Sequence, residues 1–167
     1  CRDSIITIGV FDGVHLGHKY LIKTLKKLAA QQGLYPVIIT FDKHPQEILN
    51  PESNPPFLTD PLEKKHLLKA EGVEQVILLP FNRGIADIEA EEFIRILISK
   101  LRMKSIVIGP DFALGKGARG NINAIRQLGD ELNFSVTVVP PVKIDDEIIS
   151  STSIRTALSE GKVRKVR

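Results

Sequence analysis

Short apolar runs alternate with longer segments in which apolar residues recur at helical spacing, from one end of the chain to the other. The apolar runs predict five strands, over residues 4–9, 35–41, 75–81, 105–109 and 135–139. Their apolar residues are too continuous for a strand with one polar face, which is typical of parallel strands covered on both faces. We therefore expect an α/β fold with a five-stranded, mostly parallel sheet and helices on both faces.

The segments between the strands carry helix signals at their ends. Asp60 and Pro61 are the residue types that favour an N-cap and a first helical position, and Gly33 and Gly72 favour helix ends. The helices predicted in this way span residues 17–32, 61–71, 90–101, 123–132 and 149–160. Every strand except the last is thus followed by a helix before the next strand begins.

Ligands of parallel α/β sheets bind beyond the carboxyl ends of the strands. The polar segments that follow the predicted strands should therefore gather at one edge of the sheet. We expect residues 11–18, 42–45, 111–120 and 150–155 to meet there.

Length and composition restrict the class of protein. The 167 residues predict one domain, 1–167, and 43% apolar with 26% charged residues is the balance of a globular protein. Without a membrane-length apolar run or a secretory signal, we expect a cytoplasmic protein with no membrane partner. The lone cysteine, Cys1, gives no disulfide framework or thiolate metal cluster, and no metal ligand set is predicted.

The net charge of +3 owes much to the basic tail, residues 162–167. Few aromatic residues are interleaved with the basic ones, and tryptophan is absent, so a stacking surface for single-stranded nucleic acid is poorly supported. We expect the tail to be a solvated end or linker and expect no nucleic-acid partner.

Residues 9–18, GVFDGVHLGH, join the first predicted strand to the first predicted helix. Glycines such as Gly9 and Gly17 let a backbone turn tightly and approach a ligand closely, and a helix beginning near Gly17 directs free N–H groups at the loop. His15 and His18 add two donors, each able to become cationic beside a polyphosphate. The combination favours an anion site, against the simpler alternative of a capping loop with two incidental histidines.

A second polar group, ISSTSIR, opens the last predicted helix. Ser150, Ser151 and Thr152 place three hydroxyl groups at the helix start, and Arg155 follows one turn later. Hydroxyls, helix amides and a guanidinium group together bind phosphate oxygens well. Taken alone, an N-capping serine with a surface arginine explains the motif equally well.

The early HxGH and the late ISSTxxR together resemble the paired signatures of the HIGH-type nucleotidylyltransferases. Within that group, GVFDGVHLGH, TFDKHP, GPDFALG, VVPPV and ISSTSIRTAL resemble, in order and spacing, the motifs of bacterial FAD synthetase in its FMN adenylyltransferase module. The resemblance extends from about Ile5 to Val163. It implies a Rossmann-like nucleotidylyltransferase fold and the transfer of AMP from ATP to FMN, which produces FAD and pyrophosphate.

The resemblance also implies roles for individual residues. His15, His18 and Arg155 match the catalytic positions, the histidines as contacts of the ATP phosphates and the transition state. The positions implied for ATP are Gly9, Val10, Phe11, Asp12, Gly17, Asp111, Ser151 and Thr152. Those implied for the flavin are Phe41, His44, Pro45 and Phe112.

Cofactors and partners follow from the same resemblance. ATP and FMN would be the substrates, and Mg²⁺ would be held mostly through the ATP phosphates, because magnesium prefers few protein ligands. The two-domain members of the family continue into a riboflavin kinase domain, which we expect to be absent from residues 1–167.

Two other functions stay open at this point. One is a related nucleotidylyltransferase with another phosphorylated acceptor, and the other is a flavin- or nucleotide-binding module without turnover. The chain departs from the family pattern at Ala113, Leu114 and Ile148, where the family commonly has basic or aromatic residues. Residues 115–120, GKGARG, match G-x-G-x-x-G, but no acidic residue ends the next strand, which argues against an NAD site.

Overall fold

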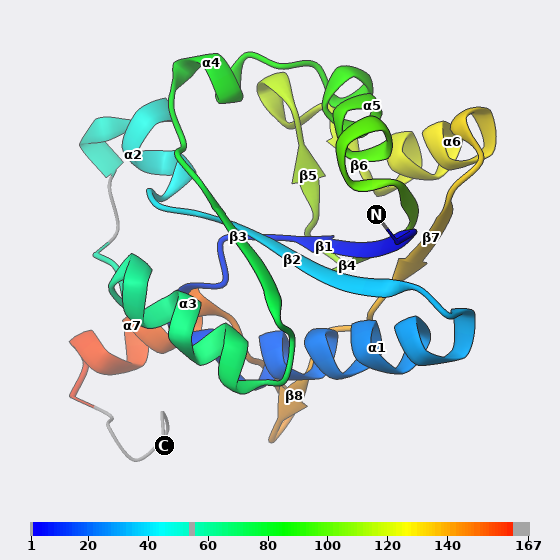
Figure 1. The fold of residues 1–167 in the computed structure, drawn as a ribbon. Helices are drawn as coiled ribbons and strands as arrows, with labels where there is room; N and C mark the ends of the chain where they lie inside the picture. Colours follow the sequence, from blue (N-terminus) through cyan, green and yellow to red (C-terminus); the bar gives the residue numbers. More distant parts are fainter. Residues whose placement is uncertain (1, 54–55, 162–167) are drawn as a thin grey trace.

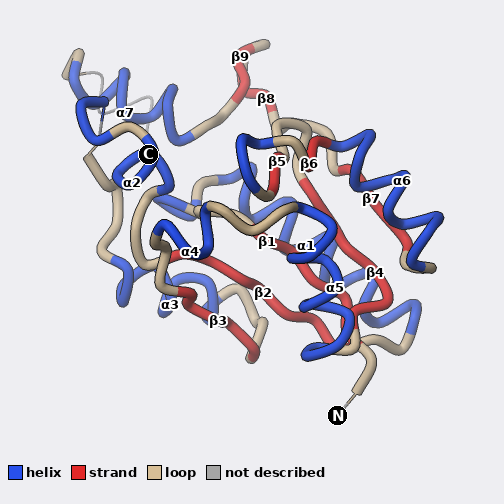
Figure 2. The backbone as a smooth tube through the Cα atoms, turned by 90° about the horizontal axis from the view of Figure 1, so that it is seen from above, coloured by secondary structure: helices blue, strands red, loops and turns tan. Residues whose placement is uncertain are grey.

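A computed structural model describes residues 2–53 and 56–161 of the chain (Figure 1). A five-stranded sheet has the order β3-β2-β1-β4-β7, and every pairing within it is parallel. Its strands are β1 (Ser4–Ile8), β2 (Tyr35–Phe41), β3 (Gln75–Leu79), β4 (Met103–Ile108) and β7 (Ser135–Val138). Figure 2 shows them side by side, with β3 and β7 at the two edges. All the carboxyl ends therefore lie along one edge of the sheet.

Helices cover both faces of this sheet. They are α1 (Leu16–Gln32), α2 (Pro45–Leu49), α3 (Pro61–Ala70), α4 (Arg83–Ala86), α5 (Ala90–Leu101), α6 (Ile122–Leu132) and α7 (Ser151–Ser159). In Figure 1, α1, α3 and α7 lie below the sheet, and α2, α4, α5 and α6 lie above it. The predicted α/β fold with a covered parallel sheet is confirmed.

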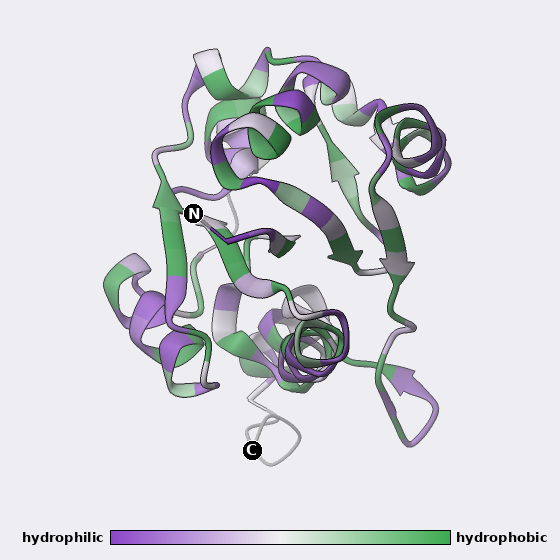
Figure 3. Cartoon of the chain, turned by 45° about the vertical axis from the view of Figure 1, so that its right-hand side comes forward, coloured by the Kyte–Doolittle hydropathy of each residue, from purple (hydrophilic) through white to green (hydrophobic). Residues whose placement is uncertain are grey.

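The core consists of two apolar clusters, one on each face of the sheet. Successive side chains of a strand point to opposite faces, so Ile6 packs into the cluster that contains Phe93 of α5, whereas Ile5 packs with Leu25 of α1 and Leu68 of α3. Both faces of each central strand are thus buried, which explains why the strands are almost continuously apolar (Figure 3).

Several predicted boundaries coincide with the capping residues that predicted them. Gly33 ends α1 with a left-handed φ of 66°, and the Asp60 carboxylate accepts a hydrogen bond of 2.8 Å from the Leu62 N–H at the start of α3. The strand predicted over 75–81 ends earlier, at Leu79. Pro80 has no N–H for a ladder, and the Phe81 N–H donates to the Asp42 carboxylate at 2.8 Å instead.

Shorter elements lie in segments that the sequence pattern left unassigned. They are the helices α2 and α4, the 3₁₀ turns η1 (Asp12–Val14), η2 (Pro51–Ser53) and η3 (Lys116–Ala118), the hairpin of β5 (Ala113–Leu114) with β6 (Gly120–Asn121), and the hairpin of β8 (Lys143–Ile144) with β9 (Glu147–Ile148). The glycine-rich segment after β4 is therefore a small hairpin. None of the helices in 2–53 and 56–161 is long and apolar enough to cross a membrane. Cys1 and the basic tail, 162–167, lie outside the described residues.

Candidate active site

The loop between β1 and α1 has an unusual backbone. Phe11, Gly13 and Val14 have φ angles of 52°, 77° and 38°, a region that residues with side chains rarely adopt. A Cβ added at Gly13 would be strained by the φ of 77° and would lie 2.9 Å from Cδ1 of Leu58, so the Leu58 side chain would have to move. Backbone strain of this kind is concentrated at functional sites, where contacts elsewhere compensate for it.

His15 and His18 lie together at the start of α1. His15 is the N-cap, and its Nδ1 accepts a hydrogen bond of 3.4 Å from the backbone N–H of His18. The two rings stack with centroids 3.6 Å apart, and the ring of Phe11 meets His18 edge-on. A Cβ added at Gly17 would lie 3.1 Å from the His15 ring, so glycine lets the ring approach the helix start; the Ile149 carbonyl oxygen, at 3.5 Å, would be in ordinary contact.

Both imidazoles are neutral at neutral pH in the free chain. Burial lowers the pKa of His15 to about 4, although the Asp12 carboxylate opposes the change. Burial, followed by the neighbouring His15 and Lys64, lowers the pKa of His18 well below 6.5. A cationic form would need an anion beside the rings, because bound phosphates raise the pKa of an imidazole.

The hydrogen bonds indicate which nitrogen carries the proton. Nδ1 of His15 accepts a hydrogen bond, so its neutral ring carries the proton on Nε2. Nδ1 of His18 is buried and has no hydrogen-bond partner among the described residues, and a bare acceptor costs less there than an unsatisfied N–H. Each ring therefore offers an Nε2–H as a donor that carries no net charge.

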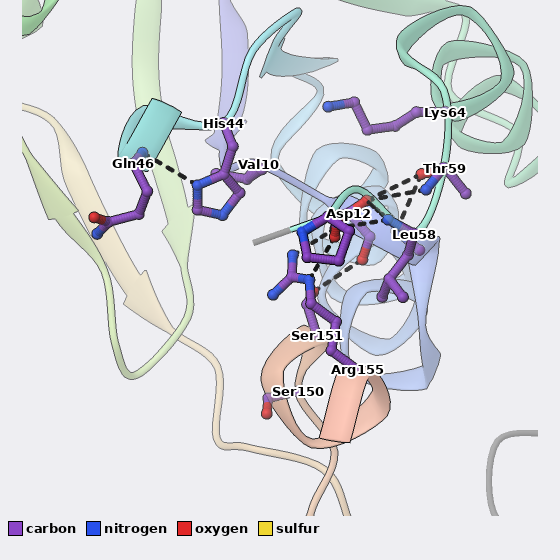
Figure 4. A network of polar contacts seen from close by, with 12 residues as sticks. Val10, Asp12, His44, Gln46, Leu58, Thr59, Lys64, Ser150, Ser151 and Arg155 are labelled. Atoms are coloured by element: carbon purple, nitrogen blue, oxygen red, sulfur yellow. Dashed lines mark hydrogen bonds and ion pairs between the residues drawn. The ribbon is translucent and has the colours of Figure 1, made fainter. Parts of the chain in front are cut away.

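Asp12 is a buried centre of polar contacts, with 1% of its side chain exposed (Figure 4). Its carboxylate forms an ion pair of 2.6 Å with Nη2 of Arg155 from α7. It also accepts hydrogen bonds of 3.0 and 3.1 Å from the Leu58 N–H and of 3.2 and 3.3 Å from the N–H and hydroxyl of Thr59. The carboxylate of Asp12 is therefore occupied by contacts within the protein. If this loop binds a nucleotide, the contacts would be made by the backbone of the loop.

The start of α7 lies directly against this loop. The Ser151 hydroxyl donates to the Asp12 carbonyl oxygen at 2.9 Å, and Nε of Arg155 donates to the Pro56 carbonyl oxygen at 2.9 Å. Ser150 caps α7 through reciprocal contacts with Ser153, and Thr152 is exposed in the first turn. The predicted meeting of residues 11–18 with residues 150–155 is confirmed, and Arg155 reaches the site paired with Asp12.

The carboxyl end of β2 joins the same region. The Thr40 hydroxyl donates to the Val10 carbonyl oxygen at 2.9 Å. His44 caps the short helix α2, where its Nδ1 accepts from the Gln46 N–H at 3.2 Å, and Pro45 is the first helical residue. Burial lowers the pKa of His44, and the positive charge of Arg155 lowers it further. The His44 imidazole is therefore close enough to Arg155 to interact with it electrostatically.

Two residues predicted for the flavin have core contacts. The Phe41 ring is buried edge-on against Phe81, with centroids 5.2 Å apart, and the half-buried Phe112 packs against the same core cluster. Of the predicted ATP positions, Asp111 lies exposed just beyond β4, on the edge of the sheet where the other segments gather.

The hairpin of β5 and β6 lies against α5. The Lys116 N–H donates to the Ile88 carbonyl oxygen at 2.9 Å, and a Cβ added at Gly115 would lie 2.5 Å from the backbone nitrogen of Ala90. Leu114, one of the departures from the family pattern, is a core residue here. Because GKGARG forms a hairpin, it lacks the strand-turn-helix geometry of a dinucleotide fingerprint.

Residues 56–59 and Lys64 belong to the site and were not predicted from the sequence. Pro56, Leu58 and Thr59 contribute mostly backbone contacts to Asp12 and Arg155, for which a sequence carries no signal. Lys64 did have a sequence signal, because it lies four residues before Leu68 and therefore on the same buried face of α3. Among the described residues, no group of three or more His, Cys, Asp or Glu side chains is placed to hold a metal ion.

A family model for FAD synthetase matches residues 1–153. The chain belongs to the FAD synthetase family. Proteins named bifunctional riboflavin kinase/FMN adenylyltransferase are 36% identical in Buchnera aphidicola (subsp. Schizaphis graminum), 36% in Bacillus subtilis and 33% in Escherichia coli K12. The matches cover 99%, 96% and 95% of this chain, and 54%, 51% and 51% of the relatives. The chain thus spans about half the length of these relatives.

The fold of this member of the FAD synthetase family also matches a solved structure. A protein from Streptococcus pneumoniae, described as a macrolide-efflux protein, superimposes with a TM-score of 0.85 at 33% sequence identity. The match covers 99% of this chain and 54% of that one. The observed sheet order and layers are therefore those of a known fold.

Proposed function

We propose that this chain transfers AMP from ATP to the phosphate of FMN, producing FAD and pyrophosphate. Membership of the FAD synthetase family and relatives whose names include FMN adenylyltransferase support this proposal. Those names also include riboflavin kinase, and the relatives are about twice as long, so the kinase activity is assigned to the part of the relatives that this chain does not cover.

The contact between the HxGH loop and the ISSTxxR helix is the observation that carries the proposal. Asp12 joins them, through its carbonyl oxygen to Ser151 and through its carboxylate to Arg155. The N-termini of α1 and α7 therefore both lie beside this loop, each with first-turn N–H groups that have no partner within their helix. Two helix N-termini, two imidazole donors and a guanidinium group suit a triphosphate.

The proposed reaction needs no strong base. An oxygen of the FMN phosphate forms a bond to the α-phosphorus of ATP, and the bond from that phosphorus to the bridging oxygen breaks, so the electron pair leaves with pyrophosphate. The attacking oxygen is already anionic. Catalysis then consists of alignment and of stabilising the charge that moves onto the leaving group.

The site residues provide that stabilisation. Neutral Nε2–H donors of His15 and His18 can approach phosphate oxygens with little desolvation cost, and their hydrogen bonds strengthen as negative charge accumulates on the leaving pyrophosphate. Thr152 adds a hydroxyl donor, whereas the Ser151 hydroxyl donates to the Asp12 carbonyl oxygen and so holds the loop against α7. Arg155 adds a positive charge, held in place by Asp12.

Magnesium would arrive with ATP and neutralise part of the phosphate charge. The only carboxylate in the loop, Asp12, already binds Arg155 and residues 58 and 59, so the described residues fit a metal that is bound through phosphates and not by a protein cage. His44 and Pro45, at the end of β2, lie on the side proposed for FMN, and Asp111, proposed for ATP, follows β4 at the same edge of the sheet. A cytoplasmic location, with no nucleic-acid or membrane partner, stays a prediction from the sequence.

A product assay tests the function. The purified chain is incubated with FMN, ATP and Mg²⁺, and FAD is followed by chromatography; parallel reactions contain CTP in place of ATP, or another phosphorylated acceptor in place of FMN. FAD formed from FMN and ATP supports the proposal. Turnover only with CTP or another acceptor would indicate a different nucleotidylyltransferase, and flavin binding without product would indicate a binding module.

A further inference from the structure

Lys64 is a fully buried lysine next to the site, with 0% of its surface exposed. It lies on α3, on the same face as Leu68, and its side chain points from α3 toward the strand ends that carry Val10 and His44 (Figure 4). Its Nζ donates a hydrogen bond of 2.7 Å to the Phe41 carbonyl oxygen and lies 5.6 Å from the centroid of the Phe57 ring.

The stability of the fold alone does not explain a lysine at this position. An ammonium group loses its hydration when it is buried, and an apolar side chain of similar volume is often neutral or better for stability. Burial lowers the pKa of Lys64, whereas the carboxylates of Asp12 and Asp42 oppose that decrease. The hydrogen bond to the Phe41 carbonyl oxygen offsets part of that cost and fixes the backbone at the end of β2.

The hydrogen bond from Lys64 holds Phe41, the last residue of β2. Phe41 is the middle one of three consecutive residues that each make a long-range hydrogen bond. Thr40 donates to the Val10 carbonyl oxygen, the Phe41 carbonyl oxygen accepts from Lys64, and the Asp42 carboxylate accepts from the Phe81 N–H. These three contacts connect the end of β2 to the HxGH loop, to α3 and to the segment after β3. The chain then turns directly into His44, the cap of α2.

The helix that carries Lys64 is itself attached to the phosphate side of the site. The Leu58 and Thr59 N–H groups, just before α3, donate to the Asp12 carboxylate, which also binds Arg155. One short segment, residues 58–64, therefore contacts both the loop proposed to bind ATP and the strand end proposed to lie beside FMN.

We propose that Lys64 is a positioning residue for the acceptor substrate: through the Phe41 carbonyl oxygen it holds the turn after β2 in register with the phosphate-binding loop. This inference rests on the proposed function. Lys64 is buried and does not touch the substrates; it acts through the backbone of residues 41–45. Its loss should therefore weaken the binding of FMN far more than the binding of ATP.

The charge of Lys64 gives a second readout that needs no flavin. The groups that face His44 are Arg155 from α7, Asp12 from the loop, Lys64 from α3 and Glu47 from α2. Both cations lower the pKa of His44, and both carboxylates raise it. His18 is faced by Lys64 and by the neighbouring imidazole of His15. Removal of the Lys64 charge, with its volume kept, should therefore raise the pKa of both histidines.

Lys64→Met removes the ammonium group and keeps an unbranched apolar chain. Lys69→Met is the matched control, because Lys69 is an exposed lysine in the last turn of the same helix. For each full chain, circular dichroism confirms folding, flavin fluorescence gives the Kd of FMN, and competition with a fluorescent ATP analogue gives the Kd of ATP. The imidazole pKa values come from NMR titration of the ring C–H signals.

We expect Lys64→Met to raise the Kd and KM of FMN about tenfold or more, because the turn after β2 is no longer held where the acceptor needs it, and to change those of ATP less than about threefold. Lys69→Met should match the wild type. If Lys64→Met does not fold, Lys64→Gln separates the two parts: its amide N–H can still donate to the Phe41 carbonyl oxygen, so FMN affinity should stay near that of the wild type while the pKa values of His18 and His44 rise. A tenfold loss of FMN affinity in Lys64→Gln would contradict the role of the hydrogen bond.

The following outcomes contradict the inference, its electrostatic part or the proposed function. In Lys64→Met, FMN affinity within twofold of the wild type overturns the inference, and so does an equal loss of FMN and ATP affinity, which indicates a general loosening of the site. Unchanged histidine pKa values would remove the electrostatic part. A wild-type chain that neither binds FMN nor makes FAD refutes the proposed function itself, and the inference with it; FAD formation that Lys64→Met leaves unaltered refutes the inference alone.

Discussion

The ion pair between Asp12 and Arg155 joins the two halves of the site, and Asp12→Asn tests it directly. Asparagine keeps the shape of the side chain and one acceptor oxygen, but it removes the charge and places an N–H₂ group among the donors of Leu58 and Thr59. Arg155 would keep its contact with the Pro56 carbonyl oxygen and lose its only ion-pair partner within the described residues.

The expected cost follows from burial. The Asp12 side chain is 1% exposed and that of Arg155 15%, so solvent screens the pair weakly. Loss of one partner of a buried pair typically costs 3–5 kcal/mol, and we expect about 3 kcal/mol here because asparagine retains part of the hydrogen bonding. For a chain of this size, that loss lowers the Tm by about 6–12 °C.

Thermal unfolding followed by circular dichroism measures the effect, with Asp3→Asn as the matched control. Asp3 pairs with Arg102 at 2.7 Å, but the two side chains are 36% and 56% exposed, so we expect a loss of less than about 1 kcal/mol and less than about 4 °C. In Arg155→Met/Asp12→Asn, the loss should be smaller than the sum of the single losses, since neither charge is left alone. Equal Tm values for Asp12→Asn and Asp3→Asn would refute the conclusion that the ion pair of Asp12 with Arg155 holds the two halves of the site together.

Three further results are expected. His18→Ala should lower kcat about 10²-fold or more, the effect of removing a transition-state donor, whereas His66→Ala, which truncates an exposed histidine on α3, should leave kcat unchanged. Equal kcat values for the two folded variants would remove His18 from the chemistry. Gly17→Ala should lower kcat at least tenfold in a steady-state assay of FAD formation, because the added Cβ lies 3.1 Å from the His15 ring and shifts it. A wild-type rate would show that the position of the ring does not matter. The pKa of His15 is about 4 in the folded chain and 6.5 in the unfolded one, so the unfolded chain binds more protons between these values; the free energy of unfolding should fall by on the order of 2 kcal/mol as the pH drops from about 6.5 to about 4. Urea titrations should show a flatter pH profile for His15→Asn, which keeps an N-cap acceptor, and parallel profiles would contradict the assignment.

The sequence predicted the parts of this fold that depend on long, regular patterns. The five strands and the helices α1, α3, α5, α6 and α7 all occur close to their predicted bounds, because a buried parallel strand and an amphipathic helix each leave a distinct periodicity. The helices α2 and α4 and the two hairpins do not reach a length at which periodicity can be recognised. The strand β3 ends at Leu79, before Pro80, which has no N–H for the sheet; this signal is present in the sequence, but the prediction followed the apolar run to Phe81.

The site was predictable where side chains carry the chemistry. Residue types and spacing favoured an anion site at the histidine pair and left the serine–arginine helix open between phosphate binding and N-capping. The family resemblance implied that the two act together, and the structure brings them into contact. Backbone groups and long-range pairings were not predictable: the Leu58 and Thr59 N–H groups around Asp12 have no sequence signature. Nor could the sequence show that Arg155 is paired with Asp12, or that burial keeps both histidines neutral.

Radiolabelled ATP tests the central claim most directly. The chain is incubated with FMN, Mg²⁺ and ATP labelled with ³²P at either the α- or the γ-phosphorus, and the products are separated by chromatography. The proposed adenylyl transfer predicts that the α-label appears in FAD and the γ-label in pyrophosphate, in equal amounts. Label that stays in ATP, or a γ-label that passes to the flavin or to free phosphate, would contradict it.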